Sequence, residues 1–165
     1  MDGVLTGYKE LFSLRAPGNS CLPALKSGRM GTIESPINDS KGCGGVMRIA
    51  PVGLAYNDAE KAFQIGCGCT AITHGHPTGY LSSGTLAALI SMIFSGESLP
   101  DTIDESIRVL NSVNHSGDSD STGSITGNIL GALYGVDILP ESWIINLELK
   151  ELIEETARYL FDQYR

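Results

Sequence analysis

Two aspartates and several hydroxyl residues lie together in the segment Gly117–Gly123, which reads Gly-Asp-Ser-Asp-Ser-Thr-Gly. Carboxylate and hydroxyl oxygens are the hard ligands that Mg²⁺ prefers in proteins. Apolar residues at three- and four-residue spacing follow over Ser121–Tyr134, so the acidic segment is expected at the start of a helix. Asp and Ser are also favoured as helix caps, because they accept hydrogen bonds from unpaired backbone N–H groups. The cluster points to a cation site, and simple capping stays open as the alternative.

Two known motifs have a similar order of residue types. An EF-hand loop counted from Asp118 needs an acid at its twelfth position, which here is Ile129, so that motif is excluded. The Asp-x-Asp-x-Thr pattern also resembles the first motif of haloacid-dehalogenase-like phosphatases, whose first aspartate ends an apolar strand. The polar run at 113–117 precedes it here, so a phosphatase is a distant alternative that would require a strand before Asp118.

A second polar segment, Asn38–Arg48, reads Asn-Asp-Ser-Lys-Gly-Cys-Gly-Gly-Val-Met-Arg. Its glycines allow backbone amides to approach a ligand without interference from a Cβ atom, which suits a phosphate or a sugar. The segment lacks the Gly-Lys-Ser/Thr ending of a P-loop, and Met47 stands where a dinucleotide motif has its last glycine. A ligand-binding loop is therefore one interpretation, and a purely structural loop is the other.

The third segment, Thr73–Tyr80, reads Thr-His-Gly-His-Pro-Thr-Gly-Tyr and is expected where a helix ends. His74 is a candidate ligand contact, although a helix-terminal histidine is more often a dipole partner or a satisfied buried group. A zinc site including Cys67 and Cys69 is disfavoured, because two-residue spacing on a helix points the two side chains to different sides.

Hydrophobic periodicity predicts helices rather than strands along most of the chain. We expect an all-α fold, because alternating apolar and polar runs are few and no repeat of fixed period occurs. The expected helices are short ones over 5–14 and 19–27, one from a capping box at Asn57 and Glu60 to His74, a buried one over Ser82–Phe94 that Gly96 ends, one from Asp101 or Thr102, one over Ser121–Tyr134, and a final one over Leu149–Tyr164.

Composition restricts the classes of partner. The chain has 165 residues, 11 Lys and Arg against 19 Asp and Glu, a formal charge of −8 and 42% hydrophobic residues. These values predict one soluble domain over 1–165 and oppose binding to nucleic acid or an anionic membrane surface. The longest apolar stretch, Leu86–Phe94, is far shorter than the roughly 20 residues that span a bilayer. With no secretory signal in view and four cysteines expected as reduced thiols, a cytoplasmic protein is expected.

Taken together and in order, the three segments resemble the ADP-ribosylglycohydrolase family. The resemblance covers most of the chain from about Ala16 onward and implies a compact all-α domain of orthogonal helices. It also implies a binuclear Mg²⁺ or Mn²⁺ centre and hydrolysis of the N- or O-glycosidic bond of ADP-ribosylated protein side chains or small ADP-ribosides.

The resemblance also implies roles for individual residues at the matching positions. Asp120 would bridge the two ions, and the ADP-ribose pocket would be lined mostly by main-chain amides. The implied metal ligands are Asp118, Asp120 and Ser121, and the implied substrate-binding residues are Ser40, Lys41, Gly42, Cys43, Gly44 and His74.

One departure from the family pattern concerns the other side of the metal centre. Family members carry an N-terminal Gly-Asp-rich opening and a Thr-Asp-Asp motif that supply further metal ligands and the acidic catalytic residue, and we find neither motif here. The side chains of Asp118, Asp120 and Ser121 offer at most five oxygens, whereas two octahedral ions have about twelve ligand positions. We therefore expect the C-terminal portion of a glycohydrolase, inactive without a complementing N-terminal half. The alternative is a non-catalytic ADP-ribose-binding or structural module.

Overall fold

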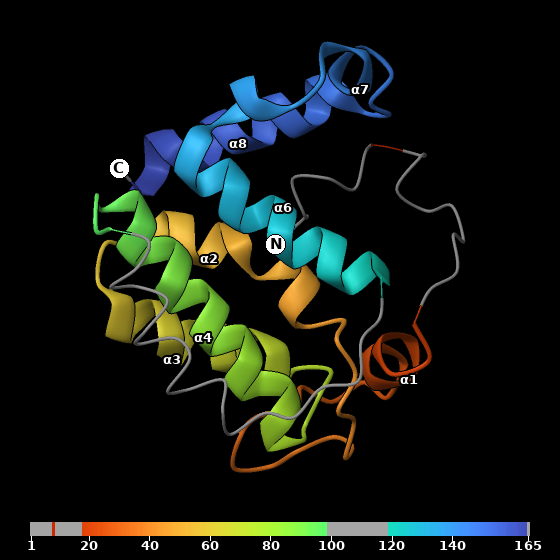
Figure 1. Cartoon of the computed structure of the whole chain (residues 1–165). Helices are drawn as coiled ribbons and strands as arrows, with labels where there is room; N and C mark the ends of the chain where they lie inside the picture. The colour runs from red at the N-terminus through yellow and green to blue at the C-terminus, as the bar shows by residue number, and fades with distance from the viewer. Residues whose placement is uncertain (1–7, 9–17, 99–118, 165) are drawn as a thin grey trace.

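The computed structural model describes Tyr8, residues 18–98 and residues 119–164. This part of the chain contains helices and no strand, which confirms the all-α prediction (Figure 1). The helices are α1 Cys21–Lys26, η2 Val46–Arg48, α2 Ala50–Ala55, α3 Ala59–Ala71, α4 Pro77–Phe94, α6 Ser119–Tyr134, η3 Val136–Ile138, α7 Glu141–Ile145 and α8 Lys150–Tyr164. The helices expected over 5–14 and from Asp101 or Thr102 fall outside the described residues, apart from Tyr8.

The core forms where α3 and α4 pack side by side and α2 covers them (Figure 1). Ala62 and Ala87 are fully buried, and their small side chains allow the two helices to approach closely. Gly66 and Gly84 bring the backbones closer still, because a Cβ built on Gly66 would lie 3.1 Å from the Cα of Gly84. From α4, Ile90 completes the core without exposure to solvent.

The start of α3 differs by one residue from the expectation. The expected capping box at Asn57 is wrong, because the N-cap residue is Asp58, whose Oδ1 accepts a hydrogen bond from the backbone N–H of Lys61 at 3.0 Å. Asp58 has extended backbone dihedrals, φ −101° and ψ 113°, as an N-cap residue should. At the other end the helix stops at Ala71, although the N–H of His74 still bonds to the carbonyl of Thr70 at 2.9 Å.

The start of α4 lies five residues before the position expected at Ser82. Pro77 occupies the first turn, where its missing N–H costs nothing, and His76 is the N-cap, its Nδ1 accepting from Thr78 N at 3.0 Å. The predicted stop is confirmed: Gly96 follows the helix with φ +91°, a conformation that glycine adopts readily.

The C-terminal helices pack more loosely than the α3–α4 pair. In α6, Ile125 and Ile129 lie half-buried against the core, and the expected final helix is confirmed as α8. No residue of α8 is fully buried.

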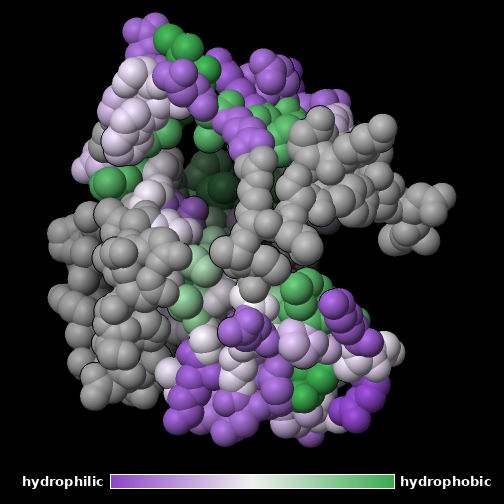
Figure 2. Space-filling model, turned by 90° about the vertical axis from the view of Figure 1, so that its right-hand side faces the viewer, coloured by the Kyte–Doolittle hydropathy of each residue, from purple (hydrophilic) through white to green (hydrophobic). Residues whose placement is uncertain are grey.

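An apolar cavity of about 500 Å³ lies between α2, the end of α4 and α8. Its lining is almost entirely apolar and includes Leu54, Phe94 and Leu160. Figure 2 shows apolar side chains in a hollow on one face of the molecule.

Two further sequence expectations can be compared with the described residues. The four cysteines, Cys21, Cys43, Cys67 and Cys69, are free, as predicted. No helix among the described residues has both the length and the hydropathy to cross a membrane.

Candidate functional site

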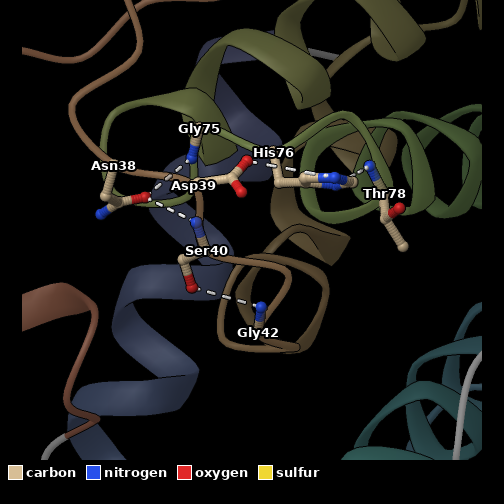
Figure 3. Close-up of polar contacts among 7 residues, drawn as sticks. All are labelled: Asn38, Asp39, Ser40, Gly42, Gly75, His76 and Thr78. Atoms are coloured by element: carbon tan, nitrogen blue, oxygen red, sulfur yellow. Dashed lines mark hydrogen bonds and ion pairs between the residues drawn. The ribbon is translucent and has the colours of Figure 1, made fainter.

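Asn38 joins two of the segments that the sequence singled out separately (Figure 3). Its Oδ1 accepts from the N–H groups of Ser40 and Gly75, each at 3.1 Å. Its Nδ2 donates to the carbonyl of Thr73 at 2.9 Å. One amide side chain therefore holds the start of the glycine segment against the segment that contains His74.

The side chain of Ser40 shapes the turn that follows. Its Oγ accepts from the N–H of Gly42 at 3.3 Å (Figure 3) and lies 2.7 Å from Oγ of Ser20, just before α1. Lys41 and Gly42 are exposed, and Cys43 and Gly44 are partly exposed. Residues 40–44, which we call the glycine loop, thus form an accessible turn whose base is fixed by side-chain hydrogen bonds.

His74 lies directly beneath the glycine loop. The residue is only 2% exposed. A Cβ built on Gly42 would lie 3.3 Å from His74 Nε2, and one built on Gly44 would lie 3.2 Å from the same atom. These distances are shorter than ordinary van der Waals contacts, so the imidazole occupies the space that side chains at both positions would need. A side chain at either position would therefore require the imidazole to shift by a few tenths of an ångström.

The charge state of His74 follows from its surroundings. Its Nδ1 lies 2.8 Å from Thr73 Oγ1, and Thr73 Oγ1 accepts from Nη2 of Arg48 at 2.7 Å. Burial lowers the pKa of His74 below its ordinary value of 6.5, and the nearby Arg48 guanidinium lowers this pKa further. The imidazole beneath the glycine loop is consequently neutral at neutral pH.

His76 and Asp39 border the same region from the outside (Figure 3). The carboxylate of Asp39 is 88% exposed and lies 4.0 Å from Nε2 of His76. An ion pair of this length and exposure contributes little to stability. His76 contributes more as the N-cap of α4, where its side chain defines the start of the helix.

The start of α6 is connected to the end of the glycine segment. Ser124 Oγ donates to the carbonyl of Met47, in η2, at 3.2 Å. Asp120 and Ser121 lie in the first turn of α6, about one turn before Ser124. Asp118 lies outside the described residues, and only the backbones of Asp120 and Ser121 are described. The helix that carries two of the three predicted metal ligands thus begins close to the segment that carries the predicted pocket.

Several residues of this site were quoted in the sequence segments without being given a role. They are Asn38, Arg48 and Thr73, which connect the two segments through the contacts above. An Asn followed two residues later by Ser is a signal for an Asx turn, so the bond from Ser40 N to Asn38 could have been anticipated. Nothing in the sequence signals the contacts of Arg48 and Thr73.

The described residues include His, Cys, Asp and Glu side chains, all of which are potential metal ligands. In these residues no three His, Cys, Asp or Glu side chains lie close enough together to hold a metal ion. Cys67 is buried in α3, and burial raises the pKa of its thiol to about 11, so it is a poor metal ligand at neutral pH.

The architecture defines an all-helical protein with an accessible glycine loop seated on a buried neutral histidine. The sequence matches the family described as ADP-ribosylglycohydrolase over residues 3–112 and 108–165. Because these matches cover most of the chain, it belongs to the ADP-ribosylglycohydrolase family.

Curated relatives bear names of the same kind. The chain is 24% identical over 177 aligned positions to ADP-ribosyl-[dinitrogen reductase] glycohydrolase of Rhodospirillum rubrum, an alignment that covers 81% of this chain and 60% of the relative. It is 30% identical over 86 positions to ADP-ribosylarginine hydrolase Tri1 of Pseudomonas putida (strain GB-1), covering 52% of this chain and 21% of the relative. The chain therefore spans no more than 60% of either relative. No solved structure shows significant similarity.

Proposed function

We propose that this chain binds ADP-ribose on its glycine loop and supplies part of the divalent-metal site of an ADP-ribosyl hydrolase. The observation that carries the proposal is the packing of the glycine loop on buried His74, next to the η2 segment that Ser124 ties to the start of α6. This arrangement supports a ligand held between the loop and the first turn of α6. The names of the relatives agree with an ADP-ribosylated substrate.

The pocket residues of this proposal are Ser40, Lys41, Gly42, Cys43 and Gly44, with His74 below them. The exposed ammonium of Lys41 favours an anionic ligand such as the diphosphate of ADP-ribose. Glycines at 42 and 44 leave the backbone accessible from outside while the imidazole fills the inner side. Direct contact between His74 and the ligand stays a prediction, because the residue is only 2% exposed.

The proposed metal ligands are Asp118, Asp120 and Ser121, and their chemistry fits Mg²⁺ or Mn²⁺, because all three donate oxygen. A bound pair of ions would polarise sugar hydroxyls and orient a water molecule at the glycosidic bond. The three side chains cannot fill the coordination of two ions, so the remaining ligands and the catalytic acid would come from a complementing N-terminal half. We accordingly propose that the chain alone has little or no hydrolytic activity.

The second candidate, a non-catalytic ADP-ribose-binding module, is favoured by one feature of the loop. The hydrogen bonds named above that shape it join Ser20, Asn38, Ser40, Gly42 and Gly75, all of which lie outside α6. The loop could therefore bind a nucleotide sugar without a metal ion.

Titration with Mn²⁺ tests the metal half of the proposal. We expect the wild-type chain to bind Mn²⁺, and Asp120→Asn to weaken that binding about tenfold or more, because a charged oxygen ligand is replaced by a neutral amide. Asp137→Asn is the matched control, since Asp137 is an exposed acid in η3 and should leave the affinity unchanged. Equal affinities in all three proteins would contradict the proposed site.

A hydrolysis assay on ADP-ribosyl-arginine tests the catalytic half. In the presence of Mg²⁺ or Mn²⁺ we expect weak or absent turnover by this chain alone. Efficient turnover that is lost in Asp120→Asn would show that the ligand set is complete within the chain, and would overturn the need for a complementing half.

A further inference from the structure

We infer that Thr73 and Arg48 are positioning residues that hold His74 in its Nε2–H tautomer, so that the ring presents a hydrogen-bond donor to the inner side of the glycine loop. This inference deepens the proposed function and rests on it only for the identity of the ligand. The tautomer itself follows from the donors and acceptors around the ring.

The hydroxyl of Thr73 determines the state of Nδ1. A guanidinium group can only donate, so the 2.7 Å contact from Arg48 Nη2 places Thr73 Oγ1 as an acceptor. The other partner of Thr73 Oγ1 among the described residues is His74 Nδ1, at 2.8 Å. If Nδ1 carried a proton, the hydroxyl would accept from both neighbours and its own proton would have no acceptor.

Burial makes that alternative unfavourable. Thr73 and His74 are each 2% exposed, so water does not readily supply the missing acceptor. A buried donor without a partner destabilises the folded state. The favoured arrangement is a directed chain in which Arg48 donates to Thr73 and Thr73 donates to Nδ1 of His74. The single proton of the neutral ring then resides on Nε2, which is not among the fully buried side-chain atoms that lack a partner in the described part of the chain.

This tautomer affects ligand binding because of where Nε2 lies. Nε2 lies at the inner side of the glycine loop, close to the Cβ positions of Gly42 and Gly44. An N–H group there attracts the oxygens of a phosphate, whereas the unprotonated nitrogen of the other tautomer would repel them. Thr73 and Arg48 thereby determine that His74 offers a hydrogen-bond donor, rather than an acceptor, to an anionic ligand. They do so without touching the ligand themselves.

The Arg48 guanidinium is also fixed by contacts other than Thr73. Its Nη2 lies 3.4 Å from the carbonyl of Cys69, and its Nη1 lies 3.6 Å from Sγ of Cys21. The first contact ties the group to the end of α3, and the second ties it to α1. These contacts support the guanidinium beside Thr73 in the ligand-free chain.

Long-range proton–nitrogen NMR on the complete, ligand-free chain at neutral pH tests the inference. We expect Nδ1 of His74 to show the resonance of an unprotonated imidazole nitrogen and Nε2 that of a protonated one. The His74→Gln spectrum assigns the signals among the three histidines. A wild-type spectrum with the proton on Nδ1 would overturn the inference without the need for any further variant.

Substitutions at Thr73 separate positioning from a merely structural role. In Thr73→Val the methyl group replaces the hydroxyl at similar volume, and we expect the Nδ1–H tautomer to become populated. Thr73→Ser retains the hydroxyl and should restore the wild-type spectrum. An unchanged tautomer in Thr73→Val would contradict the proposed role of Thr73.

Calorimetry with ADP-ribose distinguishes failure of this inference from failure of the proposed function. We expect Thr73→Val to weaken binding about tenfold, the equivalent of one lost hydrogen bond, and Thr73→Ser to bind like the wild type. If the tautomer is as predicted but the wild type does not bind ADP-ribose, the proposed ligand is wrong and the positioning of His74 stands. If ADP-ribose binds equally to wild type and Thr73→Val although the tautomer changes, the inferred effect of Thr73 on ligand binding is wrong and the proposed function stands.

Discussion

At the scale of single residues, burial and one neighbouring charge determine the protonation state of His74. The imidazole lies beneath the glycine loop and beside Arg48, and both its burial and that positive charge favour the neutral form. The same features make the stability of the fold depend on pH.

Acidification is expected to destabilise the protein through His74. The folded-state pKa lies below the ordinary value of 6.5 that applies to the unfolded chain, so the unfolded state binds more protons as the pH falls through 6.5. The free energy of unfolding should therefore decrease from pH 7.5 to pH 5.5, by at most about 1.4 kcal/mol per pH unit from this group. Urea unfolding at a series of pH values measures the slope.

Two variants show whether His74 causes that slope. His74→Gln should flatten the pH dependence between 7.5 and 5.5, whatever its effect on stability at neutral pH. His76→Gln is the comparison variant: it removes the ring whose Nδ1 caps α4 by accepting from Thr78, so it should lower stability at neutral pH. A slope that survives in His74→Gln would show that another group titrates in this range.

Residue types along the chain predicted a loop at residues 40–44 and a helix end near His74, but not the contacts that connect them. Asn38 and Thr73 are 35 residues apart, and Arg48 and Thr73 are 25 apart. Such pairs form only after α3 has brought the end of one segment next to the other. Hydrogen-bond partners at this separation depend on tertiary packing, which local spacing does not encode.

At the scale of helices, the close contact of α3 and α4 depends on a glycine in each. A Cβ at Gly84 would overlap Sγ of Cys67 and lie 2.8 Å from the carbonyl oxygen of Phe63. Because a carbonyl belongs to the helix backbone, the helices would have to separate. We expect Gly84→Ala to lower the free energy of unfolding by about 1–3 kcal/mol, as measured by chemical denaturation.

Gly68 provides the matched control in α3. It is exposed, and a Cβ at this position would meet no atom within 4 Å. Gly68→Ala should therefore raise stability by about 0.5–1 kcal/mol, because alanine loses less conformational entropy in a helix. Destabilisation of similar size in both variants would contradict the close packing of α3 on α4.

The interiors of α3, α4, α6 and α8 were predictable from hydrophobic periodicity, whereas the short α2 and α7 were not expected and helix starts were less predictable. Asp58 and Asn57 are both good capping residues, and only the backbone dihedrals decide between them. The start of α4 at Pro77 was missed because the apolar pattern begins only after the Gly79 region, while the helix is set by its proline and by His76. Caps depend on a single local hydrogen bond, which a periodic pattern does not reveal.

At the scale of the whole molecule, the two halves of the described chain differ in how completely they are packed. The α3–α4 pair supplies most of the buried side chains, whereas α8 has none and borders the apolar cavity beside α2. The periodicity of α8 predicted the helix correctly, because an amphipathic pattern specifies a helix and an apolar face. It did not predict what that face packs against.

The overall negative charge of the chain opposes binding of the proposed ligand. A chain with a formal charge of −8 repels an anionic nucleotide sugar at long range. Lys41 and a donor at His74 Nε2 offset this repulsion only locally. A divalent ion at the start of α6 would offset the repulsion more strongly. We therefore expect ADP-ribose and the metal ion to bind cooperatively.

Calorimetric titration of the chain with ADP-ribose, in Mg²⁺ and again with a chelator, measures whether the metal ion assists recognition of the nucleotide sugar. We expect measurable binding in Mg²⁺ that weakens about tenfold or more both on chelation and in Asp120→Asn, and that Asp137→Asn leaves intact. Binding of equal strength under all of these conditions would contradict metal-assisted recognition and favour the non-catalytic module. No binding by the wild-type chain in Mg²⁺ would contradict the account altogether.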